Sequence, residues 1–253
     1  EVGGEGIKRV EGARFLGVWV DEGLGWKGQV GRVKDKVGQL LGVLWRASPV
    51  LGGRSLLALY NGLVLPHLQY CLMVWGGFAV DGNGGLGAAL LSYQKRFAGL
   101  ISGQRGRFHA DPHLARLGML KVGDLYRQQL RVHAWRFLNG RLPQNQAAML
   151  SRVADVHRYG TRAARGGLFV STRDHRSVAF RVPREWGSMG ESLRTAGSLG
   201  SFKRGSRSEF LGGYAAFRCS VPACFVCLGA RGAAGNGIGG WGDGVIETEY
   251  VAV

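Results

Sequence analysis

Three of the four cysteines lie near the end of the chain, at Cys219, Cys224 and Cys227. A Cys-x2-Cys pair supplies half of a tetrahedral zinc site, which needs two further ligands. No cysteine or histidine follows Cys227, and the nearest upstream histidine is His175. The three cysteines are therefore weak zinc candidates, and we predict no resident metal or other cofactor for this chain. Cys71 lies in an apolar stretch and is predicted to be a small core residue.

The carboxylates are too dispersed for metal-dependent chemistry on nucleic acid. Polymerases and nucleases use two or three carboxylates to hold metal ions about 4 Å apart. The chain has no Asp-Asp pair, and its only adjacent acids are Asp21 and Glu22, at an expected strand end. It also has no Gly-x4-Gly-Lys-Ser/Thr loop and no Gly-x-Ser-x-Gly elbow. The sequence therefore predicts no catalytic site within this chain.

Positive charge is concentrated in one part of the chain. The net charge is +16, from 33 basic and 17 acidic residues. Residues 91–218 hold 23 basic and 7 acidic residues, so the whole excess lies there. A local field of one sign indicates a polyanionic partner, and nucleic acid is the commonest. The alternative is a genome rich in Gly and Arg codons, because glycine is also abundant, at 44 of 253 residues.

Two basic clusters are candidate contacts for a nucleic-acid backbone. The first lies at the end of an expected helix and in the loop after it, and consists of Lys95, Arg96, Arg105 and Arg107. The second surrounds an aromatic residue, and consists of Arg158, Tyr159, Arg162 and Arg165. Arginine binds phosphate at two points and stacks on bases, so both clusters suit binding that is independent of base sequence. A solvated surface is the alternative interpretation of each.

Hydrophobic periodicity predicts a mainly α-helical chain after an N-terminal β-hairpin. Strand formers run from Ile7 to Val20, with the hairpin turn expected at Glu11-Gly12. Apolar residues three and four positions apart then predict a long helix, from Val30 to Leu44 on its apolar face, and further helices over 55–64, 86–101, 124–138 and 199–214.

Local details of these elements are also predicted. Pro66 is expected to end the second helix, and Asp111 to start one before Pro112. Gln94 is expected to face solvent beside Lys95 and Arg96. Short strands are expected at 168–171 and 178–182. Residues 229–244 contain 8 glycines in 16 positions, so a disordered Gly-rich tail is expected over 228–253.

Nothing in the sequence indicates export or a membrane. No apolar run approaches the roughly 18 residues of a membrane-spanning helix, and no signal-peptide pattern is present. The cysteines do not form a pattern typical of a secreted disulfide framework. We therefore predict an intracellular protein, nuclear or cytoplasmic, with no membrane partner. The start at Glu1, without a methionine, is typical of a piece of a longer protein.

A series of short motifs extends over most of the chain. They are Phe15-Leu16-Gly17-Val18, Trp26, Leu59-Tyr60-Asn61-Gly62-Leu63-Val64-Leu65-Pro66-His67-Leu68-Gln69-Tyr70 leading into Val74-Trp75-Gly76, Tyr93-Gln94-Lys95-Arg96, Leu114-x2-Leu117-Gly118-Met119-Leu120, Asp124-Leu125-Tyr126, Leu142-Pro143, His157-Arg158-Tyr159-Gly160-Thr161-Arg162, Trp186, Ser198, Phe202 and Lys203. In this order and spacing, over residues 5–227, the chain resembles the C-terminal part of reverse transcriptases of non-LTR, LINE-like retrotransposons.

The resemblance implies a division into four regions. Residues 1–25 would be a hairpin remnant of the palm, residues 26–101 a helical thumb-like domain, and residues 102–227 a basic helical and mixed region that in the family often ends in cysteines. Residues 228–253 would be the disordered tail. The implied partners are RNA or an RNA–DNA template–primer, and a palm domain upstream in the full-length protein.

The sequence departs from the family in two places. The family's aromatic-Ala-Asp-Asp box precedes the hairpin and is absent here, so any divalent metal would belong to the missing palm and no polymerase activity is expected from the chain alone. Trp186-Gly187-Ser188-Met189-Gly190 stands where the family often has Trp-Asn-Ser-Leu-Pro. We therefore predict sequence-independent binding of nucleic acid, with a non-functional relic of a degenerate retroelement or a structural zinc module as the alternatives.

Overall fold

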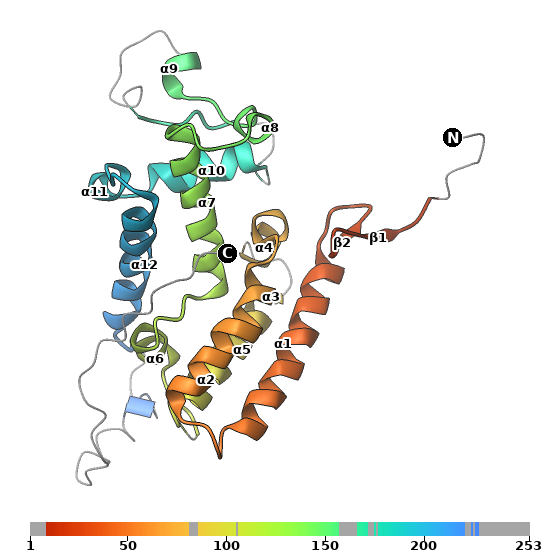
Figure 1. Ribbon diagram of the computed structural model, residues 1–253, viewed down its shortest axis with the longest axis vertical. Helices are drawn as coiled ribbons and strands as arrows, with labels where there is room; N and C mark the ends of the chain where they lie inside the picture. Colours follow the sequence, from red (N-terminus) through yellow and green to blue (C-terminus); the bar gives the residue numbers. More distant parts are fainter. Residues whose placement is uncertain are drawn as a thin grey trace. The chain divides into compact units, whose positions relative to one another are not determined.

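The computed structural model describes residues 9–80, 86–104, 106–156, 166–171, 175, 177–220, 224 and 226–227. The chain forms two compact units, residues 1–217 and residues 218–253. The first unit contains an antiparallel hairpin followed by helices, which confirms the predicted mainly α-helical fold class (Figure 1). The expected tail over 228–253 lies outside the described residues. None of the described helices has both the length and the apolarity that crossing a membrane requires.

The hairpin consists of β1, Gly12–Phe15, and β2, Val18–Asp21. Gly12 pairs with Asp21 and Phe15 with Val18, so the turn lies at Leu16-Gly17 and the predicted turn at Glu11-Gly12 is wrong. Both turn residues have positive φ, 46° and 85°, which matches the two-residue turn that suits the twist of paired strands.

The long helix predicted after the hairpin is α1, Lys27–Ala47. It buries Val30, Val33, Val37 and Leu44, so the predicted apolar face is confirmed. It packs against α5, Leu86–Ile101, whose bounds coincide with the prediction. These side chains belong to a cluster of buried hydrophobic residues that extends to Tyr214 near the end of the first unit.

The next helical segment continues past Pro66 instead of ending there. It runs through α2, Gly53–Leu59, the π-helix η1, Tyr60–Val64, and α3, Leu65–Gln69. Pro66 lies in the first turn of α3, where the missing backbone N–H costs little. The wide turn of η1 precedes it, and such turns relieve the steric conflict between a proline ring and a preceding carbonyl. The predicted helix end at Pro66 is therefore wrong.

Gln94 of α5 is fully buried, so the prediction that it faces solvent is wrong. Its Nε2 donates to the carbonyl of Leu120 at 2.8 Å and to the Tyr60 hydroxyl at 3.2 Å. Its Oε1 accepts from the Val122 backbone N–H at 2.7 Å. One amide side chain thus satisfies the polar groups where α5 meets the start of α7, Val122–Leu138.

The other described helices also belong to the first unit. They are α4, Leu72–Val80, α6, Ala110–Arg116, α8, Gln144–Ala147, α9, Val153–Val156, α10, Val178–Gly187, α11, Glu191–Arg194, and α12, Leu199–Ala215. The strand predicted at 178–182 is wrong, because Val182 and Trp186 lie four residues apart and bury one helical face of α10 against α7. The strand predicted at 168–171 is also wrong, because these residues form only an isolated antiparallel bridge, between Leu168 and Arg152.

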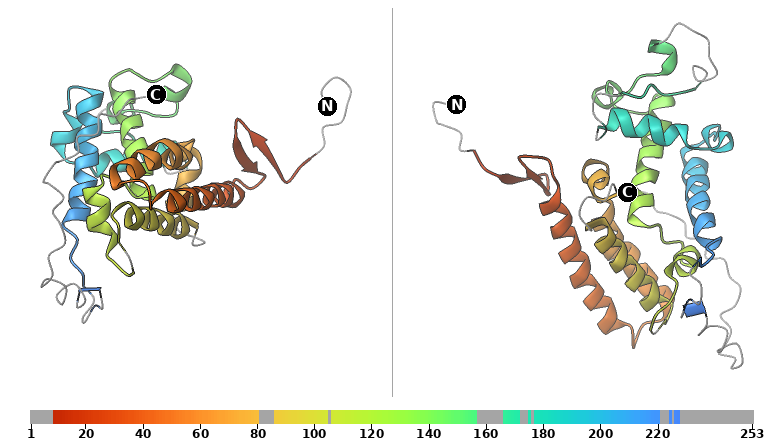
Figure 2. Two further views of the ribbon diagram at one scale, coloured as in Figure 1. Left: turned by 60° about the horizontal axis from the view of Figure 1, so that its bottom comes forward. Right: turned by 180° about the vertical axis from the view of Figure 1, so that it is seen from behind.

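A buried arginine of α7 joins α10 and α12, both of which contact α7 (Figure 2). The Arg131 side chain is 1% exposed, and its Nε donates to Glu185 of α10 at 2.8 Å. Its two terminal nitrogens donate to Glu209 of α12 at 3.1 and 3.2 Å. The guanidinium also lies 4.3 Å from the centre of the Phe210 ring. Part of the basic excess of residues 91–218 is therefore internal and holds helices together.

Candidate nucleic-acid interface and cysteine cluster

A groove of about 520 Å³ lies between the hairpin, α1 and α3. We call it the hairpin groove, and it is lined by Arg14, Trp19, Arg32, Asp35, Lys36, His67 and Tyr70, among others. Three of these side chains are arginine or lysine, three are the aromatic Trp19, His67 and Tyr70, and one is the carboxylate of Asp35. The groove therefore has a positive surface with ring faces beside it.

Trp19 fixes the position of Arg32 in the hairpin groove. The Arg32 guanidinium lies 4.3 Å from the centre of the indole ring, a cation–π contact. The Trp19 backbone N–H donates to the Gln29 side chain at 2.8 Å, which attaches β2 to α1. A Cβ at Gly28 would lie 2.6 Å from Cδ1 of the indole, so glycine at this position lets the ring lie against the helix.

The other basic side chains are placed by the regular elements. Arg32 and Lys36 are four residues apart on α1 and so share one face. Arg14 pairs with Trp19 across the hairpin and so lies on the same face of the two-stranded sheet. The Tyr70 hydroxyl donates to the Leu16 carbonyl and ties the end of α3 to the hairpin turn. Residues distant in sequence thereby line one groove.

A second groove, of about 680 Å³, lies between α1 and α5 and shares Asp35 with the first. We call it the α1–α5 groove, and its lining includes Trp45, Tyr93 and Arg96. The Arg96 guanidinium lies 5.7 Å from the centre of the Tyr93 ring. Trp45 is 67% exposed, an unusual position for a tryptophan on a helix. The two grooves follow α1 and present cations and aromatic rings along it.

The cations of the two grooves do not pair with carboxylates of the described residues. The ion pairs in that part of the chain involve Arg9, Lys121, Arg127 and Arg131. Most of them lie in α7 and the helices around it. Asp35 is the single acid among the described lining residues of either groove. A polyanion in these grooves would therefore meet cations that form no ion pair within the described chain.

The described residues include only some members of the two predicted basic clusters. Lys95 and Arg96 are exposed on α5, and Arg107 is exposed in the loop that follows. Arg96 lines the α1–α5 groove, whereas Lys95 and Arg107 line neither groove. Arg105 lies outside the described residues. So does the whole second cluster, Arg158, Tyr159, Arg162 and Arg165.

Sequence reasoning missed the cations of the hairpin groove. Residues 1–90 carry a net charge of only +2, so the distribution of charge along the sequence favours later residues as a binding surface. The spacing of Arg32 and Lys36 on an amphipathic helix was a usable signal. The approach of Arg14, His67 and Tyr70 to that helix was not, because it depends on tertiary packing.

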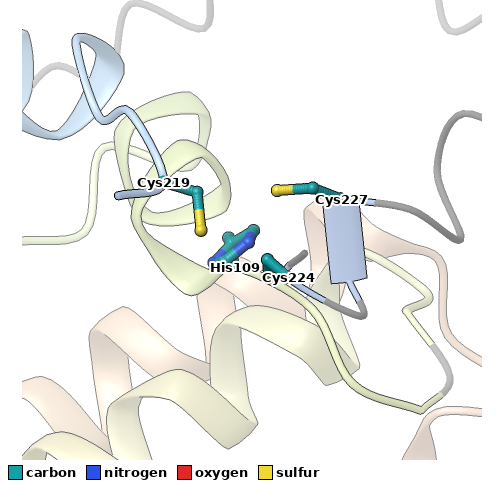
Figure 3. A group of neighbouring side chains, drawn as sticks. All are labelled: His109, Cys219, Cys224 and Cys227. Atoms are coloured by element: carbon teal, nitrogen blue, oxygen red, sulfur yellow. The ribbon is translucent and has the colours of Figure 1, made fainter. Parts of the chain in front are cut away.

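The three C-terminal cysteines gather within the second unit. The sulfur atoms of Cys219, Cys224 and Cys227 lie within 4.8 Å of one another, and none is in a disulfide (Figure 3). Burial, together with hydrogen bonds to the other two thiols, raises the pKa of Cys227 to about 11. Cys71, predicted to be a core residue, is half-buried in the first unit and packs against its core. The predicted weak zinc candidates are therefore close enough together to act as a group.

The described carboxylates and thiols differ in how they are arranged. Among the described residues, the three cysteines belong to the one group of side chains that could hold a metal ion. No set of described carboxylates lies close enough together to do the same. Asp111, Asp124, Glu185 and Glu209 instead pair with lysine or arginine. Comparison with known proteins found no matching family model, curated protein or solved structure.

Proposed function

We propose that the chain binds nucleic acid through the phosphate backbone, along α1. The observation that carries this proposal is the pair of grooves that share Asp35 and contain Arg14, Arg32, Lys36 and Arg96, with no ion pair to a described carboxylate. Phosphate contacts supply most of the affinity of sequence-independent binding.

The aromatic side chains of the grooves suit the same partner. Trp45 and Tyr93 offer rings beside Arg96, and base–aromatic stacking does not depend on the identity of the base. Arg32 is held by the Trp19 ring, so less side-chain freedom is lost when it binds a phosphate. Cations and rings together favour RNA or an RNA–DNA hybrid with accessible bases over a small anionic metabolite.

We further propose that the chain is the thumb and following region of a LINE-like reverse transcriptase. Its motif order supports this assignment, and so do two features of the hairpin. Gly17 of the motif Phe15-Leu16-Gly17 lines the hairpin groove, beside the proposed path of the nucleic acid. Phe15 and Leu16 are exposed apolar side chains, which suits contact with a palm domain in a longer protein. The chain alone would bind template–primer and would not polymerise.

Salt dependence of binding tests the phosphate contacts. If each of the four groove cations contacts one phosphate, a plot of the logarithm of the association constant against the logarithm of the salt concentration has a slope of about −3.6 or steeper. Affinity for a short RNA–DNA hybrid, measured by fluorescence anisotropy, then falls by roughly 150-fold between about 50 and about 200 mM salt. Hybrids of two unrelated sequences should bind equally well.

Matched variants locate the contacts. The double variant Arg32→Gln/Lys36→Gln should make the salt slope shallower by about two, because two phosphate contacts are lost. Arg54→Gln/Arg204→Gln removes the same charge from exposed positions on α2 and α12 that line neither groove, and should leave the slope nearly unchanged. A flat salt curve, equal effects of the two variants, or a loss confined to one sequence would refute the proposal.

A further inference from the structure

The two grooves along α1 differ in the charges that they present. In the hairpin groove, Arg14, Arg32 and Lys36 outnumber Asp35, which suits a run of successive phosphates. In the α1–α5 groove, Arg96 is the single cation among the described lining residues, and Asp35 is present there too. One carboxylate offsets one cation, so this groove attracts a run of phosphates much less. The two grooves therefore suit different parts of a nucleic acid.

The α1–α5 groove combines aromatic walls with an open floor. α1 and α5 pack against each other (Figure 1), and exposed Trp45 of α1 and half-buried Tyr93 of α5 line the space between them. Gly38 and Gly42 of α1 line it as well. A Cβ at Gly38 would lie 3.1 Å from the Tyr93 hydroxyl oxygen, whereas a Cβ at Gly42 would meet only the end of the Arg46 side chain, at 3.9 Å. A flat ring can therefore approach α1 at Gly42.

Asp35 lines both grooves and limits what each can bind. It is exposed, and none of the ion pairs among the described residues involves it. A carboxylate repels phosphate and accepts hydrogen bonds from N–H and O–H groups. An unpaired base presents N–H donors on its Watson–Crick edge, whereas in a duplex that edge is paired and the ring faces are stacked. Asp35 therefore favours an unpaired base over a phosphate beside it.

We propose that the α1–α5 groove binds an unpaired base of a strand whose other phosphates lie in the hairpin groove. This inference rests on the proposed binding along α1. The base stacks on Trp45 and Tyr93, its N–H donors face Asp35, and Arg96 binds the phosphate of the same nucleotide. The chain then prefers a hybrid with a single-stranded extension to a fully paired hybrid, because a base that is already unpaired does not have to leave a stack.

Three forms of one RNA–DNA hybrid test this base site. They are the blunt hybrid, the hybrid with a short single-stranded RNA extension, and the hybrid with an extension of equal length that lacks bases. The two extensions carry the same phosphates, so the ratio of their affinities, which we call the base preference, reports the bases alone. Fluorescence anisotropy should give the parent chain a base preference of at least about fivefold, the effect of stacking one base on an aromatic side chain.

Two glycines of α1 provide matched variants. Gly42→Leu fills the open floor of the α1–α5 groove and should lower the base preference to less than about twofold. Gly31→Leu has open space, lines neither groove and should keep the preference. Leucine is a better helix former than glycine, so neither variant should unfold α1. Trp45→Ala should also lower the preference, and Trp45→Phe, which keeps a ring, should retain most of it.

Asp35→Asn tests the carboxylate. The change removes a charge that repels phosphate, so it should strengthen binding of the abasic extension about two- to fivefold and narrow the base preference. Glu191→Gln, at an exposed position on α11 that lines neither groove, should not. A base preference that is unchanged in Asp35→Asn would refute this role of Asp35.

The outcomes separate this inference from the proposed function. Salt-dependent binding of the blunt hybrid, with equal affinity for the base-bearing and abasic extensions, would overturn the base site and leave the phosphate contacts along α1 standing. Equal effects of Gly42→Leu and Gly31→Leu on the base preference would overturn the base site as well. Absence of binding to all three hybrids would overturn both proposals.

Discussion

Arg131 provides the sharpest test of how the helices around α7 are held together. Replacing it with methionine keeps a long, flexible side chain of similar length and removes the charge. The change leaves Glu185 of α10 and Glu209 of α12 without the guanidinium that they share. Breaking a buried ion pair by removing one partner typically costs 3–5 kcal/mol, because an uncompensated charge remains.

The structure sets the expected cost near the lower end of that range. Glu185 is 12% exposed but keeps a second partner, since Arg127 Nε lies 3.1 Å from its Oε2. Glu209 is 46% exposed and can be solvated after the change. We therefore expect Arg131→Met to lower the free energy of unfolding by about 3 kcal/mol. For a chain of this size, that corresponds to a fall in Tm of roughly 6–12 °C.

Arg127→Met is the matched control on the same helix. Arg127 also contacts Glu185 and the Phe210 ring, but its side chain is 39% exposed, so its loss should cost at most about 1 kcal/mol. Urea unfolding followed by circular dichroism measures both variants. Combining Arg131→Met with Glu185→Gln should recover part of the loss, because Glu185 is the more buried of the two carboxylates that lose the guanidinium. If Arg131→Met costs no more than Arg127→Met, the network does not stabilise the helical unit as argued.

Two further predictions concern buried polar groups. Gln94→Leu leaves the Val122 N–H and the Leu120 carbonyl without their partner and should cost about 3 kcal/mol in urea unfolding, against less than about 0.5 kcal/mol for exposed Gln39→Leu. Burial, and then the charge of Arg136, lower the pKa of His133 below its ordinary value of 6.5. As the pH falls, the imidazole is therefore protonated in the unfolded chain before it is protonated in the folded chain. The free energy of unfolding should decrease as the pH drops through 6.5. His133→Leu should flatten that dependence between pH 7.5 and 5.5, and an unchanged slope in this variant would contradict the assignment.

The regular helices could be predicted from the sequence because their signal is local. Apolar residues at spacings of three and four fixed the buried face of α1, and the same pattern matched α5 and nearly matched α12. The errors occur where tertiary contacts override local preference. Val178 to Val182 has strand-forming residues, yet it is helical because α10 buries Val182 and Trp186 against α7.

For the candidate sites, the residue types and their spacing limited the chemistry that is available. It supplied an arginine-rich chain without paired carboxylates, and three cysteines within nine residues, 219–227. Which cations face a groove and which are internal depends on packing, because nothing in the sequence distinguishes Arg131 from Arg32. One is buried between Glu185 and Glu209, whereas the other lies over Trp19 in an open groove. Charge composition is a sum along the chain, whereas burial and pairing depend on contacts between residues far apart in sequence.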